Sequence, residues 1–246
     1  MIMRILTLIG FGTACLLLAA DEPKQKVQVS KTERMDFPSG GTLRLTNSFG
    51  VLTVEAWDRP GVEITTIRFT KAAYDARERE KATHELDKVR VAAERRGDEL
   101  VITTDFPRHG TFPPYPLGET NFDLEYRIKA PSTARFIAEH GIGEVNVDGL
   151  VGDIQVTLFQ GEILLHLPEE GRYKINAKSN FGNVNSDFLG QEKRRFWLIG
   201  HRIVYENSPA THTLNLRVGC GDIVILKTRV PKPFVPLTRA PKPEGV

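Results

Sequence analysis

Apolar residues recur along the chain in a pattern that is punctuated by glycine. Each copy has two alternating apolar positions, a turn, a glycine seven residues after the first apolar position, and two further alternating apolar positions. Four copies occur, at residues 43–54, 136–147, 175–186 and 214–225. Two shorter copies continue the pattern, so that a glycine recurs every nine residues at Gly143, Gly152 and Gly161. Such alternation is typical of strands with one buried face, and stacked copies bury that face together.

The spacing of these glycines selects among β architectures. Nine residues are too few for a strand, a helix and a returning parallel strand, which excludes βαβ units here. The pattern therefore predicts an all-β fold, a β-solenoid-like stack of short strands around one apolar interior. A β-sandwich of hairpins with coincidental glycine turns is the alternative. The residues expected to line the interior are Val145, Ile154, Ile163, Val184 and Ile223.

The chain before the repeats predicts strands and one helix. Residues 43–70 are rich in β-branched and apolar residues, which favour strands. Residues 71–88 are polar, with Ala82, Leu86 and Val89 at helical spacing, and predict one short amphipathic helix.

Further elements divide the chain into two parts. Residues 89–104 flank a glycine turn and predict a hairpin, whereas residues 121–129 alternate and predict a strand with one wet face. We expect an N-terminal β-rich part at 21–130 and a repeat part at 131–229. Within the repeat part, residues 189–209 depart from the pattern as an extra coil or an inserted hairpin.

The two ends of the chain have a different composition. Residues 1–20 carry one early positive charge and then an apolar run, which predicts a signal peptide cleaved near Ala20. An uncleaved anchor is the alternative. Lipidation at Cys15 is disfavoured because Gly12 stands where a lipobox needs an aliphatic residue. We expect an exported protein of the periplasm, cell envelope or extracellular space, with no stable membrane span after cleavage. Residues 230–246 contain five prolines and predict an extended, disordered tail.

Composition and charge narrow the function classes. The 246 residues include 33 Lys and Arg against 31 Asp and Glu, a net charge of +2, which argues against a nucleic-acid binder. Two cysteines cannot form a disulfide-rich scaffold. After cleavage only Cys220 remains, and we expect it buried in the core, with an intermolecular disulfide as the alternative.

No sequence motif indicates catalysis, a cofactor or a metal. The chain has no His-Glu-x-x-His, no cysteine pair at zinc spacing, no Gly-x-Ser-x-Gly and no calcium-binding β-roll repeat. Asp123 and Glu125 form a carboxylate pair on one strand face, but Arg127 and Lys129 share that face and balance the charge. We therefore predict no catalytic, cofactor-binding or metal-binding residue. Three aromatic residues of the proline-rich loop 105–120 either contact a sugar or partner protein, or pack over the sheet edge; they are Phe106, Phe112 and Tyr115.

The Gly-x-Ile/Val-x-Val strands from Gly143 to Ile225 resemble those of the bacterial putative adhesin family. The order before them is also similar: the strands at 43–57, a helix near 75–88, a hairpin, and the segment 123–131. The resemblance covers about residues 30–228. It implies a β-solenoid-like fold at the cell envelope and carries no catalytic residue across.

These observations favour an exported, non-enzymatic protein that acts as an adhesin-like or envelope-interaction module. Its expected partner is an envelope polysaccharide or protein, and open strand edges favour self-association. One alternative is a carbohydrate-active enzyme on a β-helix, which needs several acids with Arg or Lys converging on one groove. The other is a purely structural periplasmic protein.

Overall fold

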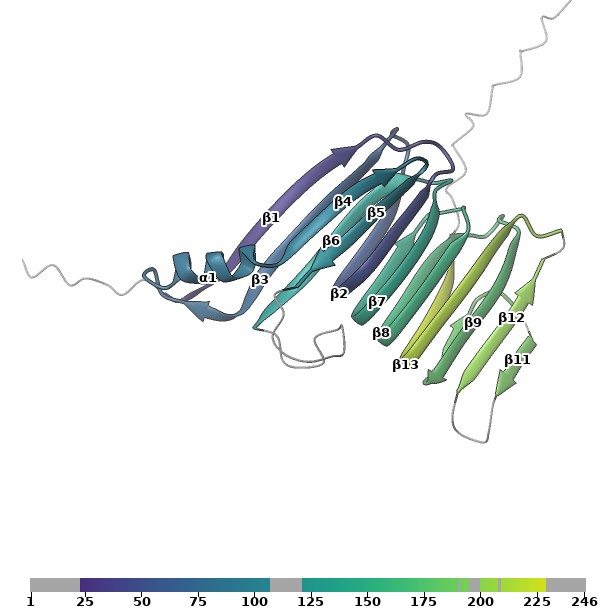
Figure 1. The fold of residues 1–246 in the computed structure, drawn as a ribbon. Coiled ribbons are helices and arrows are strands. Elements are labelled where there is room, and N and C mark those ends of the chain that lie inside the picture. The colour runs from purple at the N-terminus through teal and green to yellow at the C-terminus, as the bar shows by residue number, and fades with distance from the viewer. Residues whose placement is uncertain (1–22, 107–120, 190, 195–199, 208, 229–246) are drawn as a thin grey trace, which may run out of the picture.

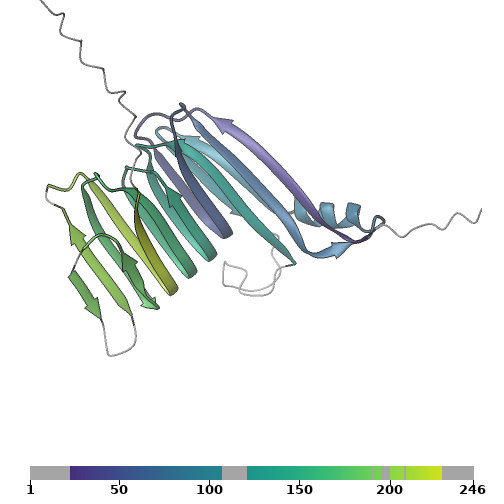
Figure 2. The same ribbon diagram turned by 180° about the vertical axis from the view of Figure 1, so that it is seen from behind.

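The computed structural model describes residues 23–106, 121–189, 191–194, 200–207 and 209–228. Within them, thirteen strands form one mixed sheet and one short helix lies beside it (Figures 1 and 2). The expected all-β class is confirmed. The predicted signal peptide, almost all of the proline-rich loop, and the predicted tail lie outside the described residues.

The elements are, in chain order, β1 (Gln25–Met35), β2 (Thr42–Trp57), β3 (Val62–Tyr74), α1 (Arg79–Asp87), β4 (Arg90–Arg96), β5 (Glu99–Asp105), β6 (Phe122–Pro131), β7 (Arg135–Asp148), β8 (Ile154–Pro168), β9 (Tyr173–Phe181), β10 (Val184–Ser186), β11 (Gln191–Arg194), β12 (His201–Glu206) and β13 (His212–Thr228).

Four long strands, β2, β7, β8 and β13, fold the sheet into two layers. Each has a first arm before a central glycine and a second arm after it. The first arm of β2 pairs with β5, whereas its second arm pairs with β6. We call one side the first-arm layer; it runs from β4 and β5 through the four first arms to β9, β12 and β11. We call the other side the second-arm layer; it runs from β1 through β3, β6 and the four second arms to β10.

The central glycines stack directly on one another. Gly50, Gly143, Gly161 and Gly221 are opposite one another in parallel pairs, all with positive φ. A Cβ atom on Gly161 would lie 1.8 Å from the carbonyl oxygen of Gly143, and one on Gly221 would lie 1.8 Å from that of Gly161. No side chain fits at these positions, so the glycine of the sequence pattern is a requirement of stacking as well as of the bend.

The apolar positions of the repeats share one interior. The five residues expected to line it, from Val145 to Ile223, are all buried in a single cluster. Leu52, Val145, Ile163 and Ile223 form a ladder across adjacent strands. The same cluster extends from Phe37 in the N-terminal part to the last strand, so one core serves both parts of the chain.

The strands differ from the expected short ones in length and in order. β7, β8 and β13 span 14, 15 and 17 residues, because each pair of expected short strands is one continuous strand bent at its glycine. β13 lies between β8 and β9, so the stack does not follow chain order. Of the two options for residues 189–209, the antiparallel pairing of β11 with β12 corresponds to the inserted hairpin.

The helix and hairpin of the N-terminal part are present, with shifted bounds. α1 is shorter than the predicted 71–88 because β3 continues to Tyr74. Ala82 and Leu86 pack with Val27 of β1 in a second small cluster. The expected hairpin is the antiparallel pair β4 and β5. None of the helices in the described ranges has the length and apolar character to cross a membrane.

Cys220 corrects one expectation, because it is exposed rather than buried. Leu214, Leu216 and Val218 point inward, and continued alternation would place Cys220 inward too. The bend at Gly221 interrupts the alternation and turns the thiol to solvent.

Candidate functional site

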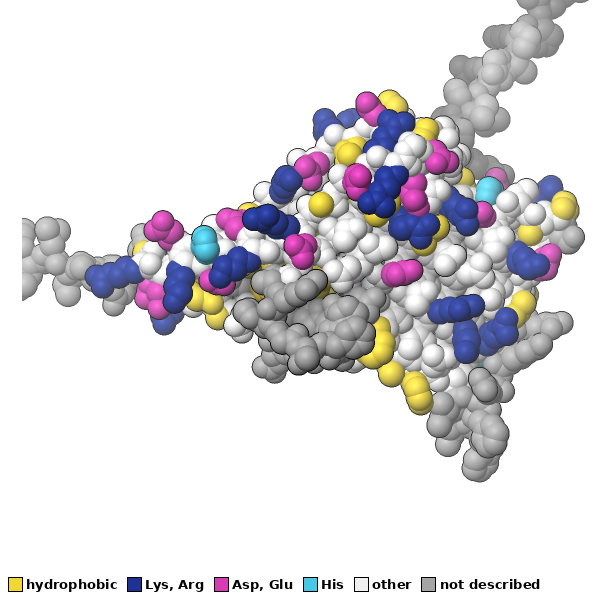
Figure 3. All heavy atoms as spheres, in the orientation of Figure 1, with side chains coloured by type: hydrophobic (Ala, Val, Ile, Leu, Met, Phe, Trp, Pro, Cys, Tyr) yellow, Lys and Arg dark blue, Asp and Glu magenta, His cyan; other side chains and the backbone are white. Residues whose placement is uncertain are grey.

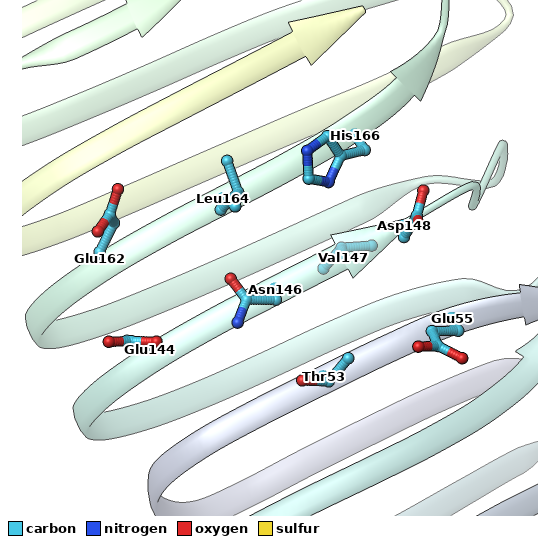
Figure 4. Close-up of a pocket in the computed structure, with 9 residues that line it drawn as sticks. All are labelled: Thr53, Glu55, Glu144, Asn146, Val147, Asp148, Glu162, Leu164 and His166. Carbon is cyan, nitrogen blue, oxygen red and sulfur yellow. The ribbon is translucent and has the colours of Figure 1, made fainter. Parts of the chain in front are cut away.

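The outward positions of the second-arm layer form an acidic hollow. Four carboxylates line it: Glu55 of β2, Glu144 and Asp148 of β7, and Glu162 of β8 (Figure 4). The hollow has a volume of about 380 Å³, and no Lys or Arg lines it. Glu144, Glu162 and Asp222 are opposite one another on adjacent strands, which extends the acidic surface onto β13.

The acidic hollow lacks the features of a catalytic or metal site. Its four carboxylates are all exposed, whereas a carboxylic acid that donates a proton in catalysis normally lies in apolar surroundings. Asp222 is already engaged, since its Oδ1 accepts a hydrogen bond from the backbone N–H of Asn183 at 2.7 Å. Among the described residues, no three His, Cys, Asp or Glu side chains are placed to hold a metal ion.

The first-arm layer carries a row of cations instead. Arg217 of β13 is opposite Lys178 of β9, and Lys178 is opposite Arg202 of β12. Figure 3 shows dark blue side chains gathered over these strands. Neighbouring strands lie about 4.8 Å apart, so like charges directly opposite one another repel. None of the three cations forms an ion pair with any carboxylate of the described ranges.

Amide side chains lie beside the cations in a second row. Asn215 of β13 is opposite Asn176 of β9, and the Asn176 amide donates a hydrogen bond to the Asn215 oxygen at 3.3 Å. Arg202 Nε donates to Asn176 Oδ1 at 2.9 Å. This link holds the guanidinium group of Arg202 along the sheet surface.

The three cations and Asn176 line a hollow of about 650 Å³, which we call the basic hollow. It contains the three cations and a single carboxylate, Glu139 of β7. Phe159 of β8 also lines it, and this side chain is 50% exposed. Beside Phe159 lies Gly219, where a Cβ atom would be 2.4 Å from the Phe159 carbonyl oxygen. The backbone contact therefore excludes a side chain, and the surface next to the aromatic ring stays open.

One histidine near the basic hollow is a core residue. His140 is 2% exposed; its Nδ1 lies 2.7 Å from Ser48 Oγ and its Nε2 lies 3.0 Å from the Gly50 carbonyl oxygen. Since a carbonyl only accepts, Nε2 carries the proton and Nδ1 accepts from the Ser48 hydroxyl. Burial lowers the pKa of His140 to about 4, so the ring is neutral at physiological pH.

The carboxylate pair considered from the sequence is engaged in surface ion pairs. Glu125 Oε1 lies 2.5 Å from Arg127 Nε, and Asp123 Oδ1 lies 3.5 Å from Lys71 Nζ. Of the loop aromatics, Phe106 packs against Phe49 with ring centroids 5.1 Å apart; the other two lie outside the described residues. The cation row was not predicted, because nothing in the sequence showed that β9, β12 and β13 are neighbours.

Comparisons with known proteins give likenesses at low identity. No protein-family model matches the chain, and no curated protein matches it. The structure of a putative cell adhesion protein from Clostridium sporogenes is 15% identical, with a TM-score of 0.45, over 82% of this chain and 100% of its own. A putative adhesin from Bacteroides fragilis is 10% identical, with a TM-score of 0.28, over 81% of this chain and 97% of its own. A putative adhesin from Parabacteroides merdae is also 10% identical, with a TM-score of 0.25, over 86% of this chain and 96% of its own. At such values the likenesses assign no ligand and no site to this chain.

Proposed function

We propose that this chain is an exported, non-enzymatic protein that acts by surface contact at the bacterial envelope, as an adhesin-like module, through its basic hollow. One observation carries the proposal: three cations, which have no ion-pair partner among the residues that the structure describes, stand side by side next to amides and a half-exposed aromatic ring. Like charges directly opposite on neighbouring strands are destabilising, so a ligand that neutralises them gains affinity from the arrangement.

The scaffold supports a binding role. β13 is hydrogen-bonded on both sides of its first arm, to β8 and to β9. The Cα atoms of such strands are held in fixed relative positions, so the spacing of the side chains along the surface is set before a ligand binds. This favours contact with an extended, repetitive ligand.

The two alternatives receive less support. The carbohydrate-active enzyme expected from the sequence needs several acids with Arg or Lys converging on one groove, but the basic hollow has one carboxylate and the acidic hollow has no Lys or Arg. A purely structural protein has no need of like charges directly opposite one another on three neighbouring strands.

The proposal is tested with the chain secreted from a bacterial host and incubated with envelope fractions. Wild-type protein should sediment with at least one fraction in a salt-sensitive manner, because exposed charges are screened by salt. The triple variant K178Q/R202Q/R217Q should not. The matched control K26Q/R90Q/K129Q, which removes three exposed cations elsewhere, should sediment like wild type.

Two outcomes contradict the proposal. Failure of the wild type to sediment with any fraction would favour the structural alternative. Release of soluble sugar from a fraction, abolished by E139Q, would favour the enzyme.

A further inference from the structure

We infer, on the basis of the proposed function, that the basic hollow binds an acidic polysaccharide, whose acid groups lie on Arg217, Lys178 and Arg202 and one of whose rings packs on Phe159. The cation row, the amides of Asn176 and Asn180, and the aromatic ring together form a surface with one kind of contact for each part of an acidic sugar.

The spacing of the cations suits a linear polymer. Each step along the row is one strand spacing, about 4.8 Å, which is close to the length of one sugar residue in an extended chain. Successive acid groups of the polymer therefore meet successive cations. Arg217 and Arg202 present planar guanidinium groups, which match a carboxylate through two parallel hydrogen bonds.

The neighbours of the cations favour a sugar over other polyanions. The amide side chains of Asn176 and Asn180 both line the hollow and both donate and accept hydrogen bonds, as sugar hydroxyl groups require. The half-exposed ring of Phe159 offers an apolar face to the C–H face of a pyranose. A nucleic acid would meet one aromatic ring here, on a chain with a net charge of only +2.

The position of the row in the sheet disfavours an acidic peptide. Extended peptides commonly bind by adding a strand to an open sheet edge. The first arm of β13 already has β8 and β9 as partners, so its backbone groups are occupied and only side chains are available. The acidic hollow on the second-arm layer repels an anionic polymer, so this hollow does not compete with the basic hollow for such a ligand.

The test uses polygalacturonate as the acidic probe, its methyl ester as the neutral form of the same chain, and polyglutamate as a polyanion without sugar rings. Binding to the secreted protein is measured by titration calorimetry. Polygalacturonate should bind, with an affinity that falls about tenfold between about 50 and about 200 mM salt. The methyl ester should not bind measurably.

Variants separate the contacts. K178Q/R202Q/R217Q should weaken polygalacturonate binding at least about tenfold, whereas K26Q/R90Q/K129Q should bind like wild type. F159A should weaken polygalacturonate binding about fivefold and leave any polyglutamate binding unchanged. Circular dichroism of each variant establishes that it is folded.

Three results would overturn the inference. One is polyglutamate binding as tight as that of polygalacturonate, with no effect of F159A. Another is polygalacturonate binding that the triple variant retains. The third is sedimentation evidence that the cation row binds the acidic layer of a second copy of this chain. If envelope binding persists and depends on the row while polygalacturonate does not bind, the ligand class is wrong and the proposed function stands.

Discussion

Substituting one glycine of the central stack tests whether close stacking of these glycines is required for the stability of the fold. In Gly161→Ala the new Cβ atom would lie 1.8 Å from the Gly143 carbonyl oxygen, where contacts between real atoms exceed about 3 Å. The neighbouring backbone must move by more than 1 Å in a strand that is paired on both sides. We expect a loss of about 4 kcal/mol in the free energy of unfolding, from about 1 to 2 kcal/mol for the positive φ and the rest for the overlap.

A control at a second glycine with positive φ, 68° against 134° for Gly161, tests the contribution of the overlap. Gly97, in the turn between β4 and β5, also has positive φ, but no atom lies within 4 Å of the position that its Cβ would occupy. Gly97→Ala should therefore lower the free energy of unfolding only through the cost of the positive φ, about 1 kcal/mol. Urea denaturation followed by circular dichroism measures both variants, and the melting temperature should fall by roughly 10 °C for Gly161→Ala and about 3 °C for Gly97→Ala. Equal losses in the two variants would refute the stacking argument.

Three further predictions concern buried and exposed side chains. The pKa of His140 in the folded protein, about 4, is below the ordinary 6.5, so the unfolded chain binds the proton first. The free energy of unfolding should fall by about 3 kcal/mol as the pH is lowered from 6.5 to 4. Denaturation at several pH values should show that His140→Gln lacks this part of the loss. The buried hydroxyl of Tyr173 has no hydrogen-bond partner among the described residues, whereas that of Tyr126 lies 2.6 Å from the Thr104 hydroxyl. Tyr173→Phe should leave stability unchanged or raise it and Tyr126→Phe should cost about 1 to 2 kcal/mol, and similar losses in urea denaturation would contradict this assignment. Cys220 should react with a thiol reagent in the native protein, and reaction only after denaturation would show that it is buried.

The sequence by itself determined which side chains face the core. Alternation with period two assigns each residue of a strand to one face, and the glycine in each copy resets the alternation at the bend. For this reason Val145, Ile163 and Ile223 were identified as interior residues without any knowledge of which strands are neighbours. The helix and the hairpin were predicted for a similar reason, since their signals are local.

Only the tertiary structure decided which strands lie side by side. The repeats resemble one another, so their apolar faces fit in more than one order, and the insertion of β13 between β8 and β9 has no local signal. That order brings Arg217, Lys178 and Arg202 together from three separate strands. The interior follows from local periodicity, whereas the candidate binding surface depends on long-range pairing, which a single sequence does not encode in any short segment.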